Sequence, residues 1–100
     1  MTIKLVNRGT EGELFLEGRL DSHSAPEAEE IFVDMASRFE TVILNMSGLE
    51  YVSSAGLRII KNLHIAMNRR GGSLTLRGVS KLVMEVFEMT GFAGLLKIEE

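Results

Sequence analysis

Hydrophobic and polar residues alternate in two short runs near the amino terminus, residues 3–6 and residues 13–17. Such alternation is typical of a strand that has one buried face and one exposed face. The stretch between the two runs, residues 8–12, is polar and contains glycine. Because glycine-containing segments of this length commonly join antiparallel strands, the pattern predicts a β-hairpin at the start of the chain.

Three later segments carry apolar residues at the spacing of an α-helix. The first begins near Ser24, a candidate N-cap, with Pro26 in the first turn and Glu27 placed to complete a capping box. The second covers residues 57–67 and is followed by two arginines and two glycines, a composition that commonly ends a helix. The third covers residues 80–91, with a serine at its start and a glycine at its end.

Strands are expected between these helices. Residues 42–44 form a continuous apolar run, which is typical of a strand covered on both faces, and residues 73–77 alternate. Residues 95–98 are predicted to add a short edge strand. The order β-β-α-β-α-β-α, with a final β, predicts a single α/β domain over residues 1–100, in which about three to four helices pack on a mixed sheet of about four to five strands.

Composition limits the kinds of binding partner and of site that the chain can have. Net charge is −3, so the chain offers no basic field for nucleic acid or an anionic membrane. There is no cysteine, which excludes disulfides and thiolate metal sites. No apolar run is long enough to insert directly into a membrane, and the amino terminus lacks the apolar core of a signal peptide. We therefore expect a soluble, cytoplasmic protein.

The segment that follows residues 42–44 holds the most informative chemistry. It leads into the second helix through two adjacent hydroxyl residues, Ser53 and Ser54. The carboxyl ends of strands in open α/β sheets are where functional loops gather. One serine suffices to cap the helix, so the second hydroxyl, followed by the small pair Ala55-Gly56, is a candidate functional group.

This segment resembles the signature of the STAS domain, as found in anti-sigma factor antagonists. The signature is an apolar strand, then Asp-x-Ser, an apolar residue, Tyr or Phe, and Ser-Ser-Ala-Gly-Leu. The matching residues are Ser47, Leu49, Tyr51, Ser53, Ser54, Ala55, Gly56 and Leu57. Residues 18–25 are similar to a second family loop, Gly-x-Leu-Asp followed by small and polar residues, and the resemblance spans essentially the whole chain. The family usually has Asp at the position of Asn45, and some relatives have Asp at Ser53.

The resemblance implies a STAS-type fold and a function in partner switching. In such antagonists the residue equivalent to Ser54 receives phosphate from a serine kinase of the GHKL type that is also an anti-sigma factor. A PP2C-type phosphatase removes the phosphate, and ATP belongs to the kinase, so no cofactor is expected in this chain. The expected partner surface joins the two loops, with contacts from Asp21, Ser22, His23, Ser24, Tyr51, Ser53, Ser54, Ala55, Gly56, Leu57 and Arg58.

The sequence leaves three other functions to compare with the antagonist. A hydrolytic role for Ser54 would need a nearby base, and the chain has only His23 and His64. The Gly-x-Ser-x-Gly motif of serine hydrolases is absent and no oxyanion loop is evident, so enzymatic activity is not expected. STAS domains also occur as subunits of lipid-transport ABC systems, where they dock on an ATPase, and as modules of stress-signalling scaffolds. Both remain alternatives to the antagonist.

Overall fold

The computed structural model describes residues 1–99 as one mixed sheet with helices packed on it. Its strands follow the spatial order β1-β2-β3-β4-β5. β1 is antiparallel to β2, and every later neighbour pair is parallel. In chain order the elements are β1 (Thr2–Arg8), β2 (Glu11–Leu20), α1 (Ala25–Arg38), β3 (Thr41–Val52), α2 (Ser54–Arg69), β4 (Ser73–Arg77), α3 (Lys81–Thr90), α4 (Phe92–Leu95) and β5 (Lys97–Ile98).

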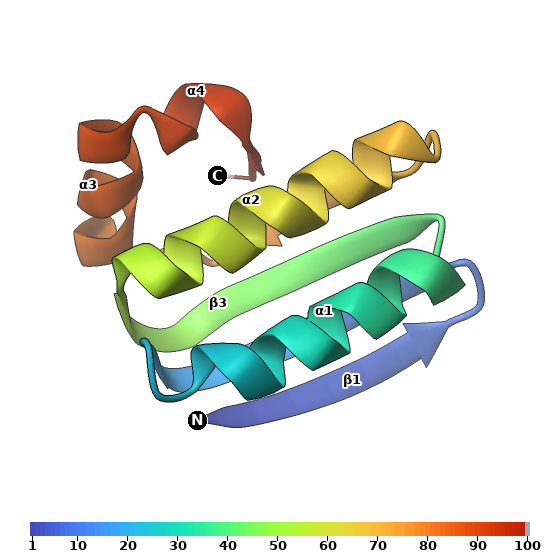
Figure 1. Cartoon of the computed structure of the whole chain (residues 1–100), viewed down its shortest axis with the longest axis horizontal. Coiled ribbons are helices and arrows are strands. Elements are labelled where there is room, and N and C mark those ends of the chain that lie inside the picture. Colours follow the sequence, from blue (N-terminus) through green and yellow to red (C-terminus); the bar gives the residue numbers. More distant parts are fainter. Residues whose placement is uncertain (100) are drawn as a thin grey trace.

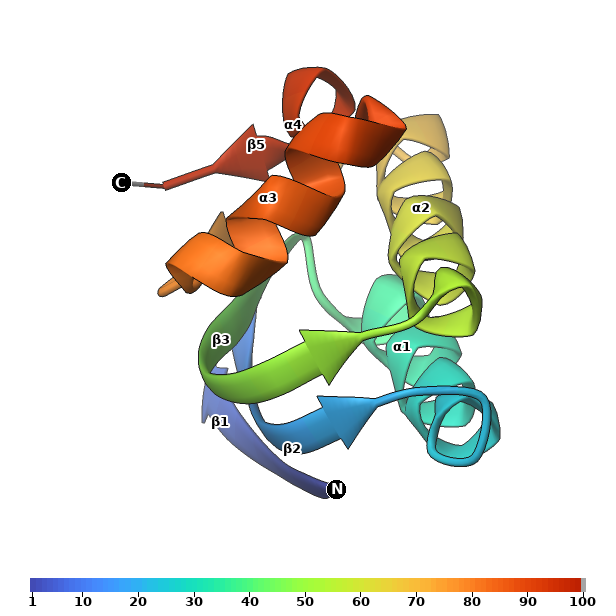
Figure 2. The same cartoon turned by 90° about the vertical axis from the view of Figure 1, so that its left-hand side faces the viewer.

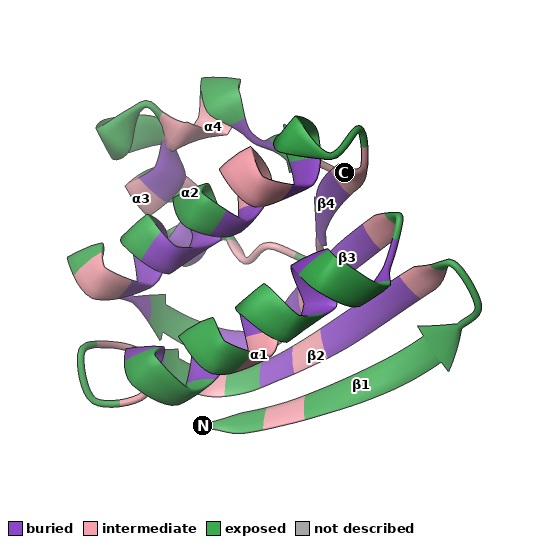
Figure 3. Ribbon diagram, turned by 45° about the vertical axis from the view of Figure 1, so that its right-hand side comes forward, coloured by how far each residue is buried: buried purple, intermediate pink, exposed green. Residues whose placement is uncertain are grey.

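The helices α1 and α2 lie side by side on one face of the sheet (Figures 1 and 2). Their buried residues face the strands, and their exposed residues face outward (Figure 3). Leu14 and Leu16 of β2 join this core, so the residues that alternate with them, Glu13 and Phe15, point to the opposite face. We call that opposite side the outer face. Near the carboxyl end of the chain, α3 adds Val83 and Phe87 to the same core.

The predicted α/β fold is confirmed, including the opening hairpin, the three main helices and the short final strand. The prediction was wrong about the third strand, which ends at Val52 and not at residue 44. β3 pairs with β2 along its whole length, but the register shifts between Phe15 and Glu17 and again between Gly18 and Arg19. Each shift is a β-bulge-like irregularity that adds a residue to β3.

These irregularities explain why the longer strand was not recognised. The buried residues in the second half of β3 are Met46, Leu49 and Val52, which lie three apart. An uninterrupted strand would bury every second residue, so the sequence of this half does not show strand periodicity. Within the part of the chain that the structure describes, no helix combines the length and apolar character needed to cross a membrane.

Candidate functional site

The two loops expected to form the partner surface lie next to each other at the carboxyl ends of β2 and β3. Leu20 is the register partner of Val52, and the backbone N–H of Ser53 donates to the carbonyl of Leu20 at 2.8 Å. Figure 2 shows the two strand ends side by side, each leading into a helix. We call this region, residues 19–24 and 51–58, the loop edge.

The adjacent serines at the start of α2 have different surroundings. Ser53 is the N-cap: its backbone is extended and its Oγ accepts a hydrogen bond from the Gly56 N–H at 3.2 Å. Ser54 is the first residue of the helix and is exposed. Among the described residues, no hydrogen bond involves the Ser54 hydroxyl, and the backbone N–H groups of Ser54 and Ala55 have no acceptor. Because Ser53 does the capping, the described fold makes no use of the Ser54 hydroxyl.

Gly56 allows the start of α2 to approach the end of β2. A Cβ atom at this position would lie 2.8 Å from Leu20 Cγ and 2.9 Å from the Leu20 carbonyl oxygen. Carbon atoms do not approach so closely without displacing one another, so a larger residue would push the two loops apart. The signature glycine therefore has a packing role here.

The predicted capping box at Ser24 is wrong. Ser24 has helical backbone angles, φ −88° and ψ −19°, and its side chain makes no hydrogen bond to the first turn of α1. Its Oγ instead donates to the Arg19 carbonyl at 2.8 Å and accepts from the Asp21 N–H at 3.0 Å. The N–H of Ala25 is bonded to the Asp21 carbonyl, so the entry to the helix is built by a backbone turn.

Asp21 organises this turn through its carboxylate. Oδ1 accepts from the N–H groups of His23 at 3.0 Å and Ser24 at 3.1 Å. The Ser24 backbone N–H is the main reason that the pKa of Asp21 lies below its ordinary value; desolvation opposes the shift, and the His23 N–H and Arg19 support it. Asp21 therefore stays ionised at neutral pH. Ser22 and His23 are exposed beside it.

The other histidine lies along α2. His64 Nε2 is 3.1 Å from the Asn68 amide nitrogen in the next turn of the same helix.

Three further residues of the predicted partner surface differ in exposure. Arg58 is exposed one turn after Ser54, Tyr51 is 39% exposed, and Leu57 is buried under the start of α2. Leu57 thus supports the loop edge from below.

Arg19 was not predicted from the sequence to be a functional residue. Its guanidinium carbon lies 4.3 Å from the centroid of the Tyr51 ring, an arrangement in which the cation sits over the aromatic face. In a regular strand Arg19 would not have faced Tyr51, because the two bulge-like shifts in β3 set this pairing. The available signal was weak: a cationic residue between Gly18 and Leu20 in the family loop.

A second polar group was also missed. Glu13 is only 2% exposed on the outer face, and its carboxylate accepts from Arg8 at 2.7 Å and from the Asn45 amide at 3.0 Å. Arg77 lies 3.4 Å from both carboxylate oxygens. We call these four residues the Glu13 cluster. Burial by itself raises the pKa of Glu13, but Asn45, Arg8 and Arg77 together hold it below its ordinary value.

Asn45 connects this cluster to the first irregularity of β3. Its Oδ1 accepts from both the backbone N–H of Ser47 at 3.1 Å and the Ser47 hydroxyl at 2.8 Å, while its amide nitrogen donates to Glu13. Both ends of the Asn45 side chain are therefore used within the chain. The bulged part of β3, which leads to Tyr51 and Ser54, is anchored in this way.

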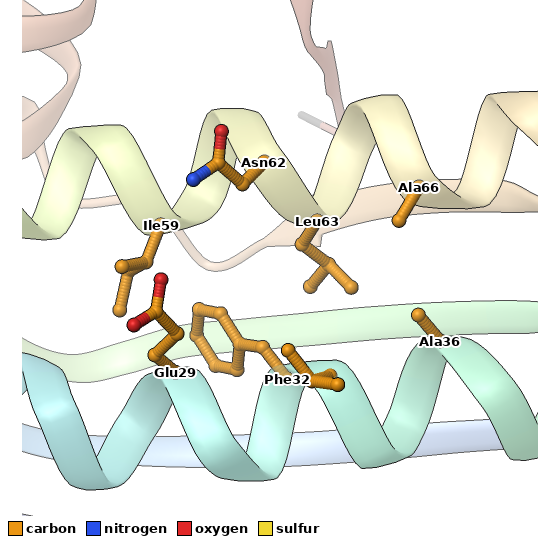
Figure 4. Close-up of a pocket in the computed structure, with 8 residues that line it drawn as sticks. Glu29, Phe32, Ala36, Ile59, Asn62, Leu63 and Ala66 are labelled. Atoms are coloured by element: carbon orange, nitrogen blue, oxygen red, sulfur yellow. The ribbon is translucent and has the colours of Figure 1, made fainter.

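A groove separates α1 from α2 (Figure 4). Phe32 and Ala36 of α1 face Ile59 and Leu63 of α2 across a cavity of about 50 Å³. Pockets for small molecules have volumes of roughly 300 to 1,000 Å³, so this space suits packing of the two helices and not a cofactor. Among residues 1–99 no group of three acidic, histidine or cysteine side chains could hold a metal ion.

Comparison with known proteins identifies the family. The family model described as "STAS domain" matches residues 3–100. The chain belongs to the STAS domain family. A curated relative, the anti-sigma-B factor antagonist of Staphylococcus epidermidis, is 30% identical over 89 residues, which cover 88% of this chain and 82% of the relative.

Solved STAS structures have the same fold. The anti-sigma factor antagonist SpoIIAA in its unphosphorylated form is 17% identical, with a TM-score of 0.79 over 99% of this chain and 88% of that one. The phosphorylated form, from Bacillus, is 18% identical, with a TM-score of 0.77 over 99% and 92%. A sulfate transporter family protein from Wolinella succinogenes is 18% identical, with a TM-score of 0.80 over 93% and 79%. At these identities the likeness concerns the fold.

The Asn45 side chain makes a contact that an aspartate at this position could not make. The Asn45 amide nitrogen lies 3.0 Å from a carboxylate oxygen of Glu13. An aspartate at position 45 would replace this hydrogen bond with a contact between two carboxylates. The negative charge in this part of the sheet comes from Glu13 on the neighbouring strand.

Proposed function

We propose that this chain is an anti-sigma factor antagonist that binds an anti-sigma factor with serine kinase activity, and that phosphorylation of Ser54 ends the binding. The observation that carries the proposal is the division of labour between two serines. Ser53 holds the helix start by accepting from Gly56, while the exposed Ser54 hydroxyl has no partner among the described residues. A kinase can reach and modify this hydroxyl without breaking the cap.

The start of α2 is suited to carry the added phosphate. A phosphoserine brings about −1.5 to −2 charges and three acceptor oxygens. The first turn of α2 contains no acidic residue, and the unbonded N–H groups of Ser54 and Ala55 lie where a helix attracts anions. Arg58, four residues after Ser54, lies on the same side of the helix. The modified domain should therefore remain folded.

The switch then acts at the interface. A partner surface that fits a neutral hydroxyl opposes the added bulk and charge of a phosphate. A loss of about 3 kcal/mol in binding free energy weakens the complex more than a hundredfold. A PP2C-type phosphatase would restore binding by removing the phosphate.

The test is a pull-down from the native lysate with wild-type, Ser54→Ala, Ser54→Asp and Ser53→Ala baits, followed by titration of the captured partner. We expect a GHKL-type kinase with Ser54→Ala and its loss with Ser54→Asp. Ser53→Ala, the matched control, retains the phosphoacceptor and should still be phosphorylated by this kinase with ATP. Identical partners for all baits would contradict the proposal, as would a large fall in melting temperature on phosphorylation.

The fold likeness to a sulfate transporter family protein supports a second candidate, a STAS subunit docked on a transport system. The same pull-down distinguishes the two. Recovery of an ABC ATPase that binds all four baits equally would favour the transporter subunit. Recovery of a sigma-regulating kinase sensitive to Ser54→Asp would favour the antagonist.

A further inference from the structure

The loop edge presents a cation, Arg19, that lies over Tyr51 and near Asp21 but donates no hydrogen bond within the described residues. Arg19 and Tyr51 are register partners at the ends of β2 and β3, and the guanidinium carbon of Arg19 lies 4.3 Å from the centre of the Tyr51 ring. The Arg19 side chain nevertheless remains 59% exposed. Tyr51 is also among the exposed large hydrophobic residues.

The N–H groups of Arg19 lack acceptors within the described residues. Its nearest carboxylate oxygen, Asp21 Oδ2, is 3.9 Å from Nε, which is too far for a hydrogen bond. The other oxygen of Asp21 is occupied by the N–H groups of His23 and Ser24. By contrast, four arginines donate to carboxylates or carbonyls elsewhere in the fold: Arg8, Arg38, Arg70 and Arg77.

The aromatic ring also orients the guanidinium before any partner arrives. A cation held over an aromatic face loses less freedom on binding than a mobile side chain does. The planar fork of arginine fits a carboxylate through two parallel hydrogen bonds. Arginine and tyrosine, with tryptophan, are enriched among the residues that dominate binding energy at protein interfaces.

Arg19 also lies on the strand end that is hydrogen-bonded to the segment carrying Ser54. The next residue, Leu20, accepts a hydrogen bond from Ser53, which adjoins Ser54. We infer that Arg19, seated on Tyr51, is a second anchor of the partner surface and receives an aspartate or glutamate side chain of the bound anti-sigma factor. This inference rests on the proposed function, and it adds a charge requirement that the partner must meet.

The experiment measures binding of the anti-sigma factor recovered with the Ser54→Ala bait, by calorimetry at low and at physiological salt. Arg19→Glu should weaken binding about tenfold or more, because it places like charges opposite each other. Arg19→Lys should lose part of the affinity, since it keeps the charge but not the fork. Tyr51→Phe should bind nearly as wild type, whereas Tyr51→Leu, which lacks the ring, should bind several-fold more weakly.

The matched control is Lys4→Glu, which makes the same change of charge at an exposed position of β1, outside the loop edge. It should alter affinity less than twofold. A reversal of one partner carboxylate to arginine should restore binding of Arg19→Glu. That rescue depends on a direct pair, so a general effect of net charge would not produce it.

The outcomes separate the two proposals. If no anti-sigma factor binds the wild-type chain, both fall. If the factor binds in a Ser54-dependent way and Arg19→Glu binds as tightly as wild type, only the role of Arg19 is overturned. Equal affinities for Arg19→Lys and wild type would overturn the proposal that the arginine binds a carboxylate through two parallel hydrogen bonds. Should Arg19→Glu fail to fold, Arg19→Gln takes its place, with a loss of affinity expected and wild-type affinity again overturning the role.

Discussion

The Glu13 cluster and the loop edge are two polar regions of one sheet with opposite states of hydrogen bonding. In the cluster, a buried carboxylate is surrounded by Arg8, Arg77 and Asn45, and its acceptors are satisfied within the chain. At the loop edge, the Ser54 hydroxyl and the Arg19 guanidinium are exposed and have no hydrogen-bond partner among the described residues. Both regions contain charged or hydroxyl side chains, so residue type alone does not distinguish them.

The difference indicates which region contributes to folding stability and which contributes to binding. A buried polar group that loses its partner is costly, because water cannot replace the lost hydrogen bond. An exposed group without a partner costs little in the free chain and gains when another protein supplies the bond. We therefore expect substitutions in the Glu13 cluster to reduce folding stability. We expect Arg19→Glu and Ser54→Asp at the loop edge to reduce binding with little change in stability.

The largest effect on stability is expected for Glu13→Ala. It leaves the Asn45 amide without its acceptor and two arginines close together, and should lower the free energy of unfolding by about 2 kcal/mol. The arginines are roughly half exposed and can turn to water, which keeps the loss below that of a fully buried ion pair. Urea denaturation measures it.

Glu17→Ala is the control for this change, since Glu17 is an exposed glutamate on the same strand. It should stay within about 0.5 kcal/mol of wild type. Equal losses for the two variants would remove the contrast between the regions.

Asn45→Asp should have the next largest effect. Two carboxylates would then meet where the Asn45 amide now donates to Glu13 at 3.0 Å, and we expect a loss of about 1–2 kcal/mol at neutral pH. Repulsion raises the folded-state pKa of the pair, so stability should recover as the pH falls and one carboxyl takes up a proton. Adding Glu13→Gln should restore the hydrogen bond, because the new amide at position 13 can donate to the new carboxylate at position 45. If the double variant were as unstable as the sum of its parts, the two residues would not be coupled.

The Glu13 cluster and the loop edge also show which features the sequence could predict. The helices, the hairpin and the strand at residues 73–77 follow from regular periodicity, and the family signature points to Ser53 and Ser54. The second half of β3 could not be predicted, because its bulges replace strand periodicity with a spacing of three. Arg19 and Glu13 depend on which side chains meet across neighbouring strands. Such register is set by tertiary packing, so neither position stood out in the linear pattern.

Within the loop edge, Ser53→Ala and Ser54→Ala sharpen the comparison to adjacent residues with the same side chain. Ser53→Ala removes the acceptor for Gly56 and should cost about 1 kcal/mol of folding stability, as other N-cap losses do. Ser54→Ala should change stability by less than about 0.5 kcal/mol, because its hydroxyl supports nothing in the fold. Thermal or urea unfolding of the two variants measures this difference in stability. A larger loss for Ser54→Ala would mean that its hydroxyl has a structural role.

The smallest effects are expected in the pH dependence of stability. Glu13 and Asp21 both have folded-state pKa values below the ordinary ones, Glu13 because its hydrogen bonds and neighbouring arginines outweigh burial, and Asp21 mainly because of the Ser24 N–H. A carboxylate of this kind stabilises the fold fully above its unfolded pKa, and the contribution is lost as the pH falls through the folded value. Unfolding free energy should therefore be flat near neutrality and should decline below the ordinary glutamate value of 4.5. Glu13→Gln should flatten the decline more than Asp21→Asn does, because Glu13 is buried while Asp21 is screened by water. A steeper contribution from Asp21 would place the main acid-sensitive contact at the loop edge and reverse the contrast between the two regions.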